Sequence, residues 1–399
     1  MRKIKIGQVG IGSRGHWLLK DVMLENEKCE VVAVCDVYED RTKEAQDMVN
    51  EKYGKVPFGT QDYMEIVKHP DVELVVITAA WEAHVPVAIA AMENGKMVAL
   101  EVGGSYSVEQ CWDLVKCYER TKMPFMFLEN CCYGKRELMI LNMVQQGLFG
   151  EIVHCAGGYH HDLRNEISFG KEKRHYRLRN YLNRNCENYP THELGPIARV
   201  LNINHGNRMV SLTSTASKAA GLKEYIKQKK SDDEELMNAT FNQGDVVTTV
   251  IKCAGGETIV LTLDTTLPRC YTRGFRVNGT KGMYQEEIDT VFIDGMEKEH
   301  WSWKPLWGNA EKYEEEYMHP IWKDYIKSGV QGGHDGMDWL EFDRMFDCIL
   351  EGRDMEIDVY DAASWMCITA LSEKSIALGS MPVEIPDFTN GYWTMRKGE

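Results

Sequence analysis

The stretch Ile4-Lys5-Ile6-Gly7-Gln8-Val9-Gly10-Ile11-Gly12-Ser13-Arg14-Gly15 decides the fold of this 399-residue chain. Its alternating apolar run ends in the spacing Gly-x-Gly-x-x-Gly, and a helix-like run follows. In such a turn the first glycine permits the sharp bend, the second lets the backbone approach a pyrophosphate, and the third lets the helix pack on the strand. The N–H groups at the helix start also attract phosphate. The stretch therefore predicts a dinucleotide site that includes Gly10, Gly12 and Gly15.

A second apolar run supports this prediction. It spans Glu30 to Cys35 and ends on Asp36, an acid about 20 residues after the last glycine. An acid in this place accepts hydrogen bonds from the adenosine ribose and repels a 2′-phosphate. Asp36 therefore favours NAD over NADP. An ordinary strand-to-helix turn without a ligand is the alternative.

Composition limits the partners and the compartment. The formal net charge is −15, which argues against nucleic acid and against an anionic membrane as partners. The twelve cysteines are scattered in apolar surroundings without a Cys-x-x-Cys pair, which predicts buried, reduced thiols. The N-terminus runs straight into the first strand, and no apolar run is long enough for a membrane span. We therefore expect a cytoplasmic protein.

The order of strands and helices predicts two domains. Short apolar strands alternate with helical stretches over residues 1–130, the rhythm of an α/β domain with a parallel Rossmann sheet. Residues 131–399 contain a run of strands with a Gly255-Gly256 hairpin turn, which predicts an α+β domain on an open, largely antiparallel sheet. Helices are expected over residues 85–94 and 194–201. The polar stretch 164–188 has no clear periodicity and is expected to be an active-site loop.

Polar or aromatic residues follow the strands of the first domain at the ends where ligands bind in such sheets. We expect them to converge on one crevice, although any single one of them is equally well explained as a loop cap. These residues are Asp36, Trp81 to His84, Glu101 and Asn130.

A Rossmann-like domain followed by an open antiparallel sheet resembles the Gfo/Idh/MocA oxidoreductase superfamily. Members usually carry Glu-Lys-Pro after the fifth strand, and the lysine assists hydride transfer. This chain has Glu101-Val102-Gly103 in that place and no lysine. The resemblance therefore does not lead to an ordinary sugar dehydrogenase.

The remaining motifs resemble glycoside hydrolase family 109, the NAD-dependent α-N-acetylgalactosaminidases. They run along nearly the whole chain, and Tyr-Pro-Thr-His is specific to this group. Two departures are Gly103, where the family usually has proline, and Glu193, where it usually has glycine. The matching stretches are Trp81-Glu82-Ala83-His84, Glu101-Val102, Leu128 to Gly134, Glu137 to Val144, Tyr189-Pro190-Thr191-His192, Gly333 to Asp338, Val359 to Ala362 and Pro386 to Thr389.

The resemblance implies a set of binding residues, position by position. The implied NAD contacts are Ser13, Arg14, Asp36, Trp81, His84, Glu101, Val102 and Asn130, and the implied sugar contacts are Tyr159, Arg177, Tyr189, His192 and Tyr271.

The resemblance also implies a redox-assisted elimination. NAD takes a hydride from carbon 3 of the sugar, a base removes the acidified proton at carbon 2, the glycosidic oxygen leaves, water adds, and the hydride returns. His192 is the first candidate base, because its ordinary pKa lies near neutrality. The alternative is a histidine that only caps the following helix.

Three tyrosines have two interpretations each. Tyr189 would act as a base or, with greater weight, would only hydrogen-bond the sugar. Tyr133 would face the nicotinamide or would be a buried core residue. Tyr271 would bind the sugar or would pack on the surface.

Other kinds of site are disfavoured. His160 and His161 are adjacent, so on a strand they would point to opposite faces and would not easily share one ion. We expect no metal. No carboxylate pair for direct glycoside hydrolysis and no Gly-x-Ser-x-Gly motif can be identified.

The sequence therefore predicts a glycosidase that holds and recycles NAD and acts on terminal N-acetylgalactosamine or a related hexosaminide. The alternatives are an NAD-dependent dehydrogenase that releases a 3-keto sugar and a non-catalytic NAD-bound sugar sensor. Because an open sheet face usually requires a partner, we also expect a homo-oligomer, either a dimer or a tetramer.

Overall fold

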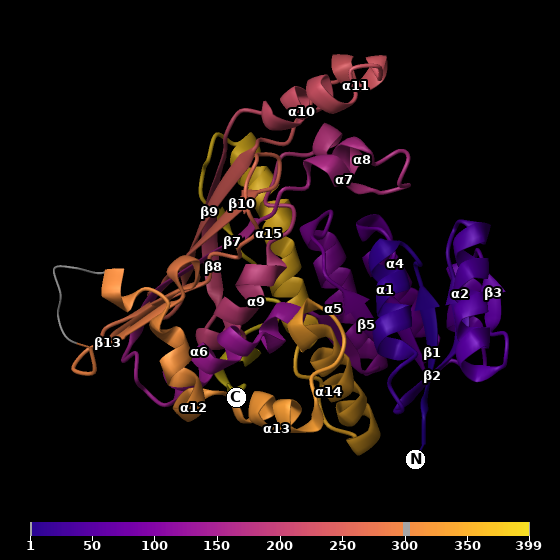
Figure 1. The fold of residues 1–399 in the computed structure, drawn as a ribbon, viewed down its shortest axis with the longest axis horizontal. Helices are drawn as coiled ribbons and strands as arrows, with labels where there is room; N and C mark the ends of the chain where they lie inside the picture. The colour runs from indigo at the N-terminus through magenta and orange to yellow at the C-terminus, as the bar shows by residue number, and fades with distance from the viewer. Residues whose placement is uncertain (1, 298–303, 399) are drawn as a thin grey trace. The chain divides into compact units, whose positions relative to one another are not determined.

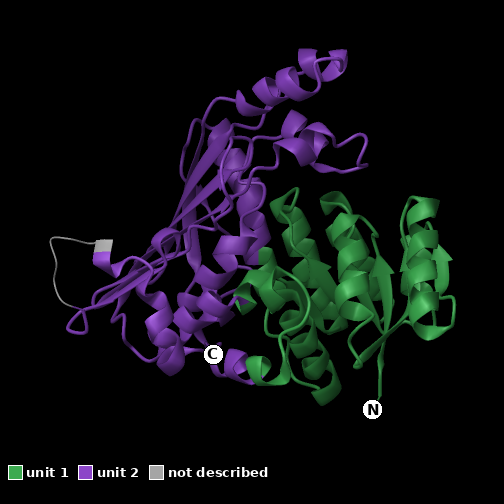
Figure 2. Cartoon of the chain, in the orientation of Figure 1, with its two compact units in different colours: residues 1–133, 325–363 green, residues 134–324, 364–399 purple. Residues whose placement is uncertain are grey.

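The computed structural model describes residues 2–297 and 304–398. Its contacts divide the chain into two compact units (Figure 2). Unit 1 comprises residues 1–133 and 325–363, and unit 2 comprises residues 134–324 and 364–399. The division between residues 130 and 131 that the sequence suggests stays a prediction, since unit 1 also takes in a distant segment.

Unit 1 is built on a six-stranded sheet in the order β3-β2-β1-β4-β5-β6, and all its strand pairs are parallel. The central strands are apolar along their whole length because helices cover both faces of such a sheet; all four residues of β4 and of β6 are buried. This confirms the predicted Rossmann sheet. The strands are β1 (Ile4–Val9), β2 (Cys29–Cys35), β3 (Phe58–Thr60), β4 (Leu74–Ile77), β5 (Met97–Glu101) and β6 (Phe125–Leu128).

The helices of residues 1–133 alternate with the strands of unit 1 in βαβ order (Figure 1), and two further helical elements come from residues 325–363. The helix predicted at residues 85–94 begins earlier, at Trp81. Trp81 and His84, which the prediction placed ahead of the helix, therefore lie in its first turn. The helical elements are α1 (Ser13–Leu18), η1 (Leu19–Met23), α2 (Glu39–Tyr53), α3 (Tyr63–Lys68), α4 (Trp81–Glu93), α5 (Val108–Thr121), η2 (Asn130–Tyr133), η6 (His334–Gly336) and α14 (Met337–Glu351).

Unit 2 is built on an eight-stranded sheet in the order β13-β12-β11-β7-β10-β9-β8-β14. Every neighbouring pair is antiparallel except β7 and β10, which confirms the largely antiparallel sheet. Side chains of β9 alternate between buried and exposed, so one face of the sheet forms the core. The strands are β7 (Ile152–His160), β8 (Met209–Ala216), β9 (Val246–Cys253), β10 (Thr258–Asp264), β11 (Arg276–Gly279), β12 (Gly282–Gln285), β13 (Thr290–Ile293) and β14 (Val383–Glu384).

Two helix predictions in unit 2 need correction. The stretch 164–188 is not one irregular loop, because it contains α7 and α8. The helix expected from residue 194 begins at Thr191, so His192 belongs to its first turn. The helices are α6 (Lys135–Gln145), α7 (Arg164–Ser168), α8 (Arg177–Asn183), α9 (Thr191–Val200), α10 (Gly221–Lys229), α11 (Glu234–Asn238) and α12 (Glu314–Tyr317), with short 3-10 turns η3 (Glu286–Ile288), η4 (Lys304–Leu306), η5 (Asn309–Tyr313) and η7 (Tyr392–Thr394).

Two helices have residues in both units, α13 (Pro320–Ser328) and α15 (Val359–Ala377). Within the described ranges, which include all twelve cysteines, every cysteine is free and only Cys270 is exposed. This agrees with the predicted reduced thiols. Among the same residues, no helix combines the length and apolarity that crossing a bilayer requires.

Candidate functional site

The glycine turn after β1 has the shape that a dinucleotide requires. Gly10 has a φ of +98°, and a Cβ built on it would lie 2.4 Å from the backbone nitrogen of Ala79. A Cβ on Gly15 would lie 2.2 Å from the carbonyl oxygen of Gly10. The space beside Gly12 is open, because a Cβ built on this residue would lie 3.8 Å from Arg41 Nη1, an ordinary van der Waals contact. The turn thus tolerates only glycine at two positions and leaves room at the third for a pyrophosphate.

Two buried polar side chains that the sequence reading missed hold this turn. Gln8 Nε2 donates a hydrogen bond of 2.8 Å to the carbonyl oxygen of Gly15. The hydroxyl of Thr78 donates to the carbonyl oxygen of Gly10. A polar residue inside an otherwise buried strand was the available signal, because buried polar groups are nearly always hydrogen-bonded.

Asp36 lies at the end of β2 and contacts the same turn. Its Oδ2 accepts a hydrogen bond of 2.7 Å from the backbone N–H of Ile11, and its Oδ1 accepts one of 3.0 Å from the N–H of Tyr38. The Arg41 guanidinium lies over the Tyr38 ring, 4.9 Å from its centroid. The carboxylate is therefore fixed beside the turn, where an adenosine ribose is expected.

His84 lies in the first turn of α4 and is buried. Its Nε2 lies 3.0 Å from the carbonyl oxygen of Ala79, so this nitrogen carries the proton. Burial lowers the pKa of His84 to about 4, and the ring is neutral. Its Nδ1 is buried and has no hydrogen-bond partner among the described residues, which leaves an acceptor for a bound group.

Arg14 and Glu101 are paired within unit 1. Arg14 Nε donates a hydrogen bond of 2.6 Å to Glu101 Oε1. The second oxygen of Glu101 accepts a hydrogen bond of 2.9 Å from the backbone N–H of Val102. Ser13, the other predicted contact of the turn, is exposed at the start of α1.

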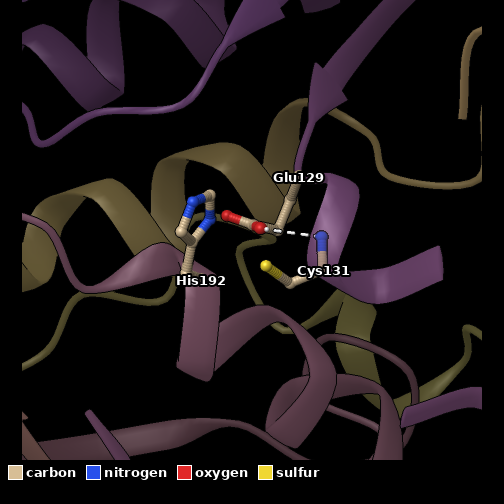
Figure 3. Close-up of side chains that lie close together, drawn as sticks. All are labelled: Glu129, Cys131 and His192. Carbon is tan, nitrogen blue, oxygen red and sulfur yellow. Dashed lines mark hydrogen bonds between the residues drawn. The ribbon is translucent and has the colours of Figure 1, made fainter. Parts of the chain in front are cut away.

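The turn that follows β6 begins with Glu129, which is fully buried. Glu129 Oε1 accepts a hydrogen bond of 3.2 Å from the backbone N–H of Cys131 (Figure 3). Between these two residues, Asn130 donates a hydrogen bond of 2.7 Å to Asp338 Oδ1. The predicted cofactor residues thus lie on the carboxyl side of the parallel strands, as the Rossmann arrangement requires.

The predicted sugar contacts come together within unit 2. The rings of Tyr159 and Tyr189 have centroids 4.5 Å apart, and the rings of Tyr189 and His192 have centroids 4.8 Å apart. His192 Nε2 lies 3.4 Å from the hydroxyl oxygen of Tyr189. Tyr271 is half exposed and meets Tyr159 edge-on at 6.5 Å. Tyr159 lies in β7, Tyr189 just before α9, His192 in α9 and Tyr271 in the segment before β11.

Arg177 and His161 complete this cluster. The Arg177 guanidinium lies 5.0 Å from the centroid of the Tyr189 ring, and its Nε lies 2.9 Å from Glu166 Oε1. His161 Nδ1 lies 3.0 Å from the Tyr159 hydroxyl, and its ring lies 5.0 Å from that of Tyr271. The sequence reading considered His161 only as a metal ligand and missed its place here. We call Tyr159, His161, Arg177, Tyr189, His192 and Tyr271 the aromatic cluster.

Two charge states within the cluster follow from burial. Burial raises the pKa of Tyr159 even though the charge of Arg177 lowers it, so Tyr159 remains a phenol. Burial and the Arg177 charge lower the pKa of His161, so this ring is neutral near pH 7. Tyr159 can therefore donate a hydrogen bond, and the Arg177 guanidinium places a positive charge against the rings of Tyr159 and Tyr189.

Comparison with known proteins identifies the family. Residues 133–395 match the family model described as the C-terminal domain of glycosyl hydrolase 109, and residues 4–128 match the NAD-binding Rossmann fold of the oxidoreductase family. A glycosyl hydrolase family 109 protein from Stenotrophomonas maltophilia is 38% identical over 99% of this chain and 91% of the relative. The chain belongs to glycosyl hydrolase family 109.

A second relative agrees with this assignment to family 109, and a solved structure shares the fold. An α-N-acetylgalactosaminidase from Tannerella forsythia is 36% identical over 99% of this chain and 88% of the relative. Levoglucosan dehydrogenase, solved with NADH and L-sorbose, has a TM-score of 0.69 at 18% identity, covering 97% of this chain and all of that one. The chain is thus a glycoside hydrolase with a domain of the class that binds a nicotinamide cofactor.

The two departures from the usual family 109 pattern have structural counterparts. A Cβ built on Gly103 would lie 2.4 Å from the Trp81 ring, so this indole occupies the space that a larger residue 103 would need. A Cβ built on Gly157 of β7 would lie 2.6 Å from the Cβ of Glu193. Glycine in β7 therefore makes room for the buried Glu193 side chain one position after His192.

Tyr133 has the environment of a core residue, the second of its two interpretations. It is fully buried, and its hydroxyl donates a hydrogen bond of 2.9 Å to Glu356 Oε2. Glu356 also accepts a hydrogen bond of 3.0 Å from Arg344 Nε. The assignment of the other site residues in this family 109 chain stays a prediction that mutation can test.

Proposed function

We propose that this family 109 hydrolase acts on terminal N-acetylgalactosamine or a related hexosaminide, and that it uses tightly bound, recycled NAD. The observation that carries the proposal is the contact between His192 Nε2 and the Tyr189 hydroxyl inside the aromatic cluster. An imidazole beside a phenol, ringed by further aromatic groups, provides both a base and a surface for the apolar face of a sugar.

His192 is the proposed base. It lies in the first turn of α9, which fixes its backbone, and Tyr189 lies just before that helix. The imidazole would take the proton at carbon 2 or that of the hydroxyl at carbon 3. The Tyr189 hydroxyl would hold the ring and bond the sugar, because one phenol can serve as both donor and acceptor.

The remaining members of the cluster would bind the sugar. Tyr159 stays protonated and can donate a hydrogen bond to a sugar oxygen. Arg177 is buried and positively charged, so it favours the oxyanion that develops when carbon 2 loses its proton. Tyr271 is half exposed, as expected of a group that closes over a substrate from the solvent side.

The residues of unit 1 fit a nicotinamide dinucleotide. The open space at Gly12 fits a pyrophosphate, the fixed carboxylate of Asp36 fits a ribose diol, and the buried Nδ1 of His84 fits a donor group. When bound, NAD would accept a hydride from carbon 3 of the sugar and return it after water has added, so that the net reaction is hydrolysis. Arg14, Glu101, Val102 and Asn130 would complete the contacts.

The substrate class draws support from the α-N-acetylgalactosaminidase of Tannerella forsythia. The test uses purified protein without added cofactor, mixed with p-nitrophenyl N-acetyl-α-galactosaminide in heavy water. We expect p-nitrophenol release together with deuterium at carbon 2 of the sugar. Release without deuterium would refute the elimination, and absence of both, with NAD confirmed bound, would refute this substrate.

Two alternatives predict other outcomes of the same experiment. A net dehydrogenase would accumulate NADH and stop without added NAD, and the absence of lysine in Glu101-Val102-Gly103 disfavours it. A sugar sensor would bind the glycoside and exchange no proton at carbon 2.

We also propose a homo-oligomer. The exposed positions of β9 include Val250, and Val153 of β7 is half exposed, so the sheet presents apolar side chains outside the core. Light scattering should give a dimer or a tetramer, and a monomer at micromolar concentration would refute the proposal.

A further inference from the structure

Asp338 carries four side-chain hydrogen bonds at the start of α14, and it is fully buried. Its Oδ1 accepts from Asn130 Nδ2 at 2.7 Å and from Arg14 Nη2 at 2.9 Å. Its Oδ2 accepts from Arg14 Nη1 at 2.8 Å and lies 2.7 Å from His334 Nδ1. One carboxylate therefore connects three side chains that lie far apart in the sequence.

Two of these three side chains are predicted cofactor contacts. Arg14 lies within the glycine-rich stretch, in the first turn of α1, and Asn130 follows β6. Arg14 is held on two sides, because its Nε bonds Glu101 while its two terminal nitrogens form a bidentate pair with Asp338. Bidentate arginine–carboxylate pairs fix the guanidinium plane as well as its position.

The third side chain belongs to a segment with an uncommon backbone. His334 and Asp335 have φ values of +48° and +54°, a region that residues other than glycine seldom adopt. The rings of Trp17 in α1 and His334 meet edge-on, with centroids 5.4 Å apart. A Cβ built on Gly333 would lie 2.1 Å from the Trp17 ring. Backbone strain of this kind persists only where surrounding contacts hold it, and such positions cluster at functional sites.

We propose that Asp338 is a positioning residue for the nicotinamide cofactor: it holds Arg14 and Asn130 in place and anchors the segment Gly333 to Asp335. The inference rests on the proposed function, because it concerns the site that would hold NAD. Among the described contacts, Asp338 is the side chain that bonds both terminal nitrogens of Arg14.

The negative charge of Asp338 contributes to this positioning role. Burial would raise the pKa of this carboxyl, but the hydrogen bonds from Arg14 and His334 lower it far below its usual range. Burial would likewise lower the pKa of Arg14, but the attraction of Glu101 and the bonds to Asp338 raise it. Both groups therefore stay charged, although Asp338 is buried and Arg14 is partly buried, and replacing Asp338 by a neutral residue leaves Arg14 less restrained.

The matched control lies on the same helix. Asp343 accepts a hydrogen bond of 3.0 Å from Asn26 and lies 2.8 Å from Lys28 Nζ, so it too makes buried or half-buried polar contacts in unit 1. It contacts none of the predicted cofactor residues in the described contacts. Asp343→Asn therefore reports what the loss of an ordinary structural carboxylate does.

The test measures how fast NAD leaves the holoenzyme by exchange with labelled NAD. We expect Asp338→Asn to speed NAD release about tenfold or more, which corresponds to the loss of one charge-assisted hydrogen bond. Asp343→Asn should change the release rate less than about twofold. In an Arg14→Gln background, Asp338→Asn should speed release by a smaller factor than it does in the wild type, because part of its effect passes through Arg14 and the rest through Asn130. Of the two single variants, Asp338→Asn should shift the fluorescence of enzyme-bound NADH, and Asp343→Asn should not.

Each other outcome contradicts the inference. Equal release rates for Asp338→Asn and Asp343→Asn, or an undiminished effect in the Arg14→Gln background, would make Asp338 merely structural. If Asp338→Asn does not fold, Asp338→Glu keeps the charge and displaces it by one methylene, and unaltered release from that variant would equally overturn the inference. A wild-type protein that holds no NAD would refute the proposed function itself, and this result is distinguishable from the outcomes that concern only Asp338.

Discussion

The imidazole Nε2 of His192 lies 3.4 Å from the phenolic oxygen of Tyr189, three residues earlier in the chain. The two side chains meet because α9 begins between them, at Thr191. If His192 is the base, His192→Ala should lower kcat/KM roughly 10²–10⁴-fold and abolish deuterium incorporation at carbon 2. Turnover of p-nitrophenyl N-acetyl-α-galactosaminide checks this.

The control for His192 is His154, a histidine of β7 whose Nδ1 lies 2.9 Å from the Thr258 hydroxyl. His154→Gln should leave turnover within about twofold of wild type. Tyr189→Phe should lower kcat/KM less than His192→Ala, since it leaves the imidazole in place. A Tyr189→Phe variant as inactive as His192→Ala would assign the base role to the phenol.

His161 should matter for binding rather than for proton transfer. Its contact with the Tyr159 hydroxyl at 3.0 Å orients a phenol that stays protonated. His161→Phe keeps the ring and removes the hydrogen bond, and we expect KM to rise about tenfold with a smaller change in kcat. Steady-state kinetics separates the two constants, and a loss confined to kcat would instead place His161 in the chemistry.

Cofactor choice should depend on Asp36. Its carboxylate is fixed by the backbone N–H groups of Ile11 and Tyr38, so it cannot turn away from a 2′-phosphate. Asp36→Asn should reduce the preference for NAD over NADP by about 10–100-fold, measured from the two dissociation constants. Asp40→Asn removes the same charge from exposed α2 and should leave the preference unchanged; an equal change would indicate a general charge effect.

Glu187 should make stability depend on pH. Burial raises the pKa of this carboxyl to about 8, although N–H groups of Tyr189 and Leu263 lower it. Because the folded protein keeps a proton that the unfolded chain loses near pH 4.5, stability should fall as pH rises from about 5 to 8, by at most about 1.4 kcal/mol per pH unit. Glu187→Gln should flatten this dependence in thermal unfolding, whereas Glu151→Gln, at an exposed position, should not.

The fold was predictable because its signals are local. Strand periodicity, the glycine spacing and the hairpin glycines each act within a few residues, and both sheets follow from them. Both misplaced helix starts lie close to a proline. Pro86 and Pro196 are each the sixth residue of a helix, at Trp81–Glu93 and Thr191–Val200, whereas proline usually marks the first turn. The starts predicted at residues 85 and 194 place each proline in the first turn and so omit residues 81–84 and 191–193.

The site was predictable only where a motif marked it. The aromatic cluster joins β7, α8 and α9, and the resemblance supplied most of its members by position. His161 and Asp338 were missed as site residues because their roles depend on contacts with Tyr159 and Arg14. The second contact spans 324 residues, and no local pattern encodes such a pairing.

The discontinuity of unit 1 has a consequence for how the protein is made. Residues 325–363 belong to this unit, yet the ribosome adds them after the whole strand-rich stretch of unit 2. The nascent Rossmann segment therefore lacks α14, and Arg14 lacks its bidentate partner Asp338, until most of the chain has emerged. Cofactor capture should accordingly be a late event of synthesis, and a stop codon placed before residue 325 should yield a chain that cannot retain NAD.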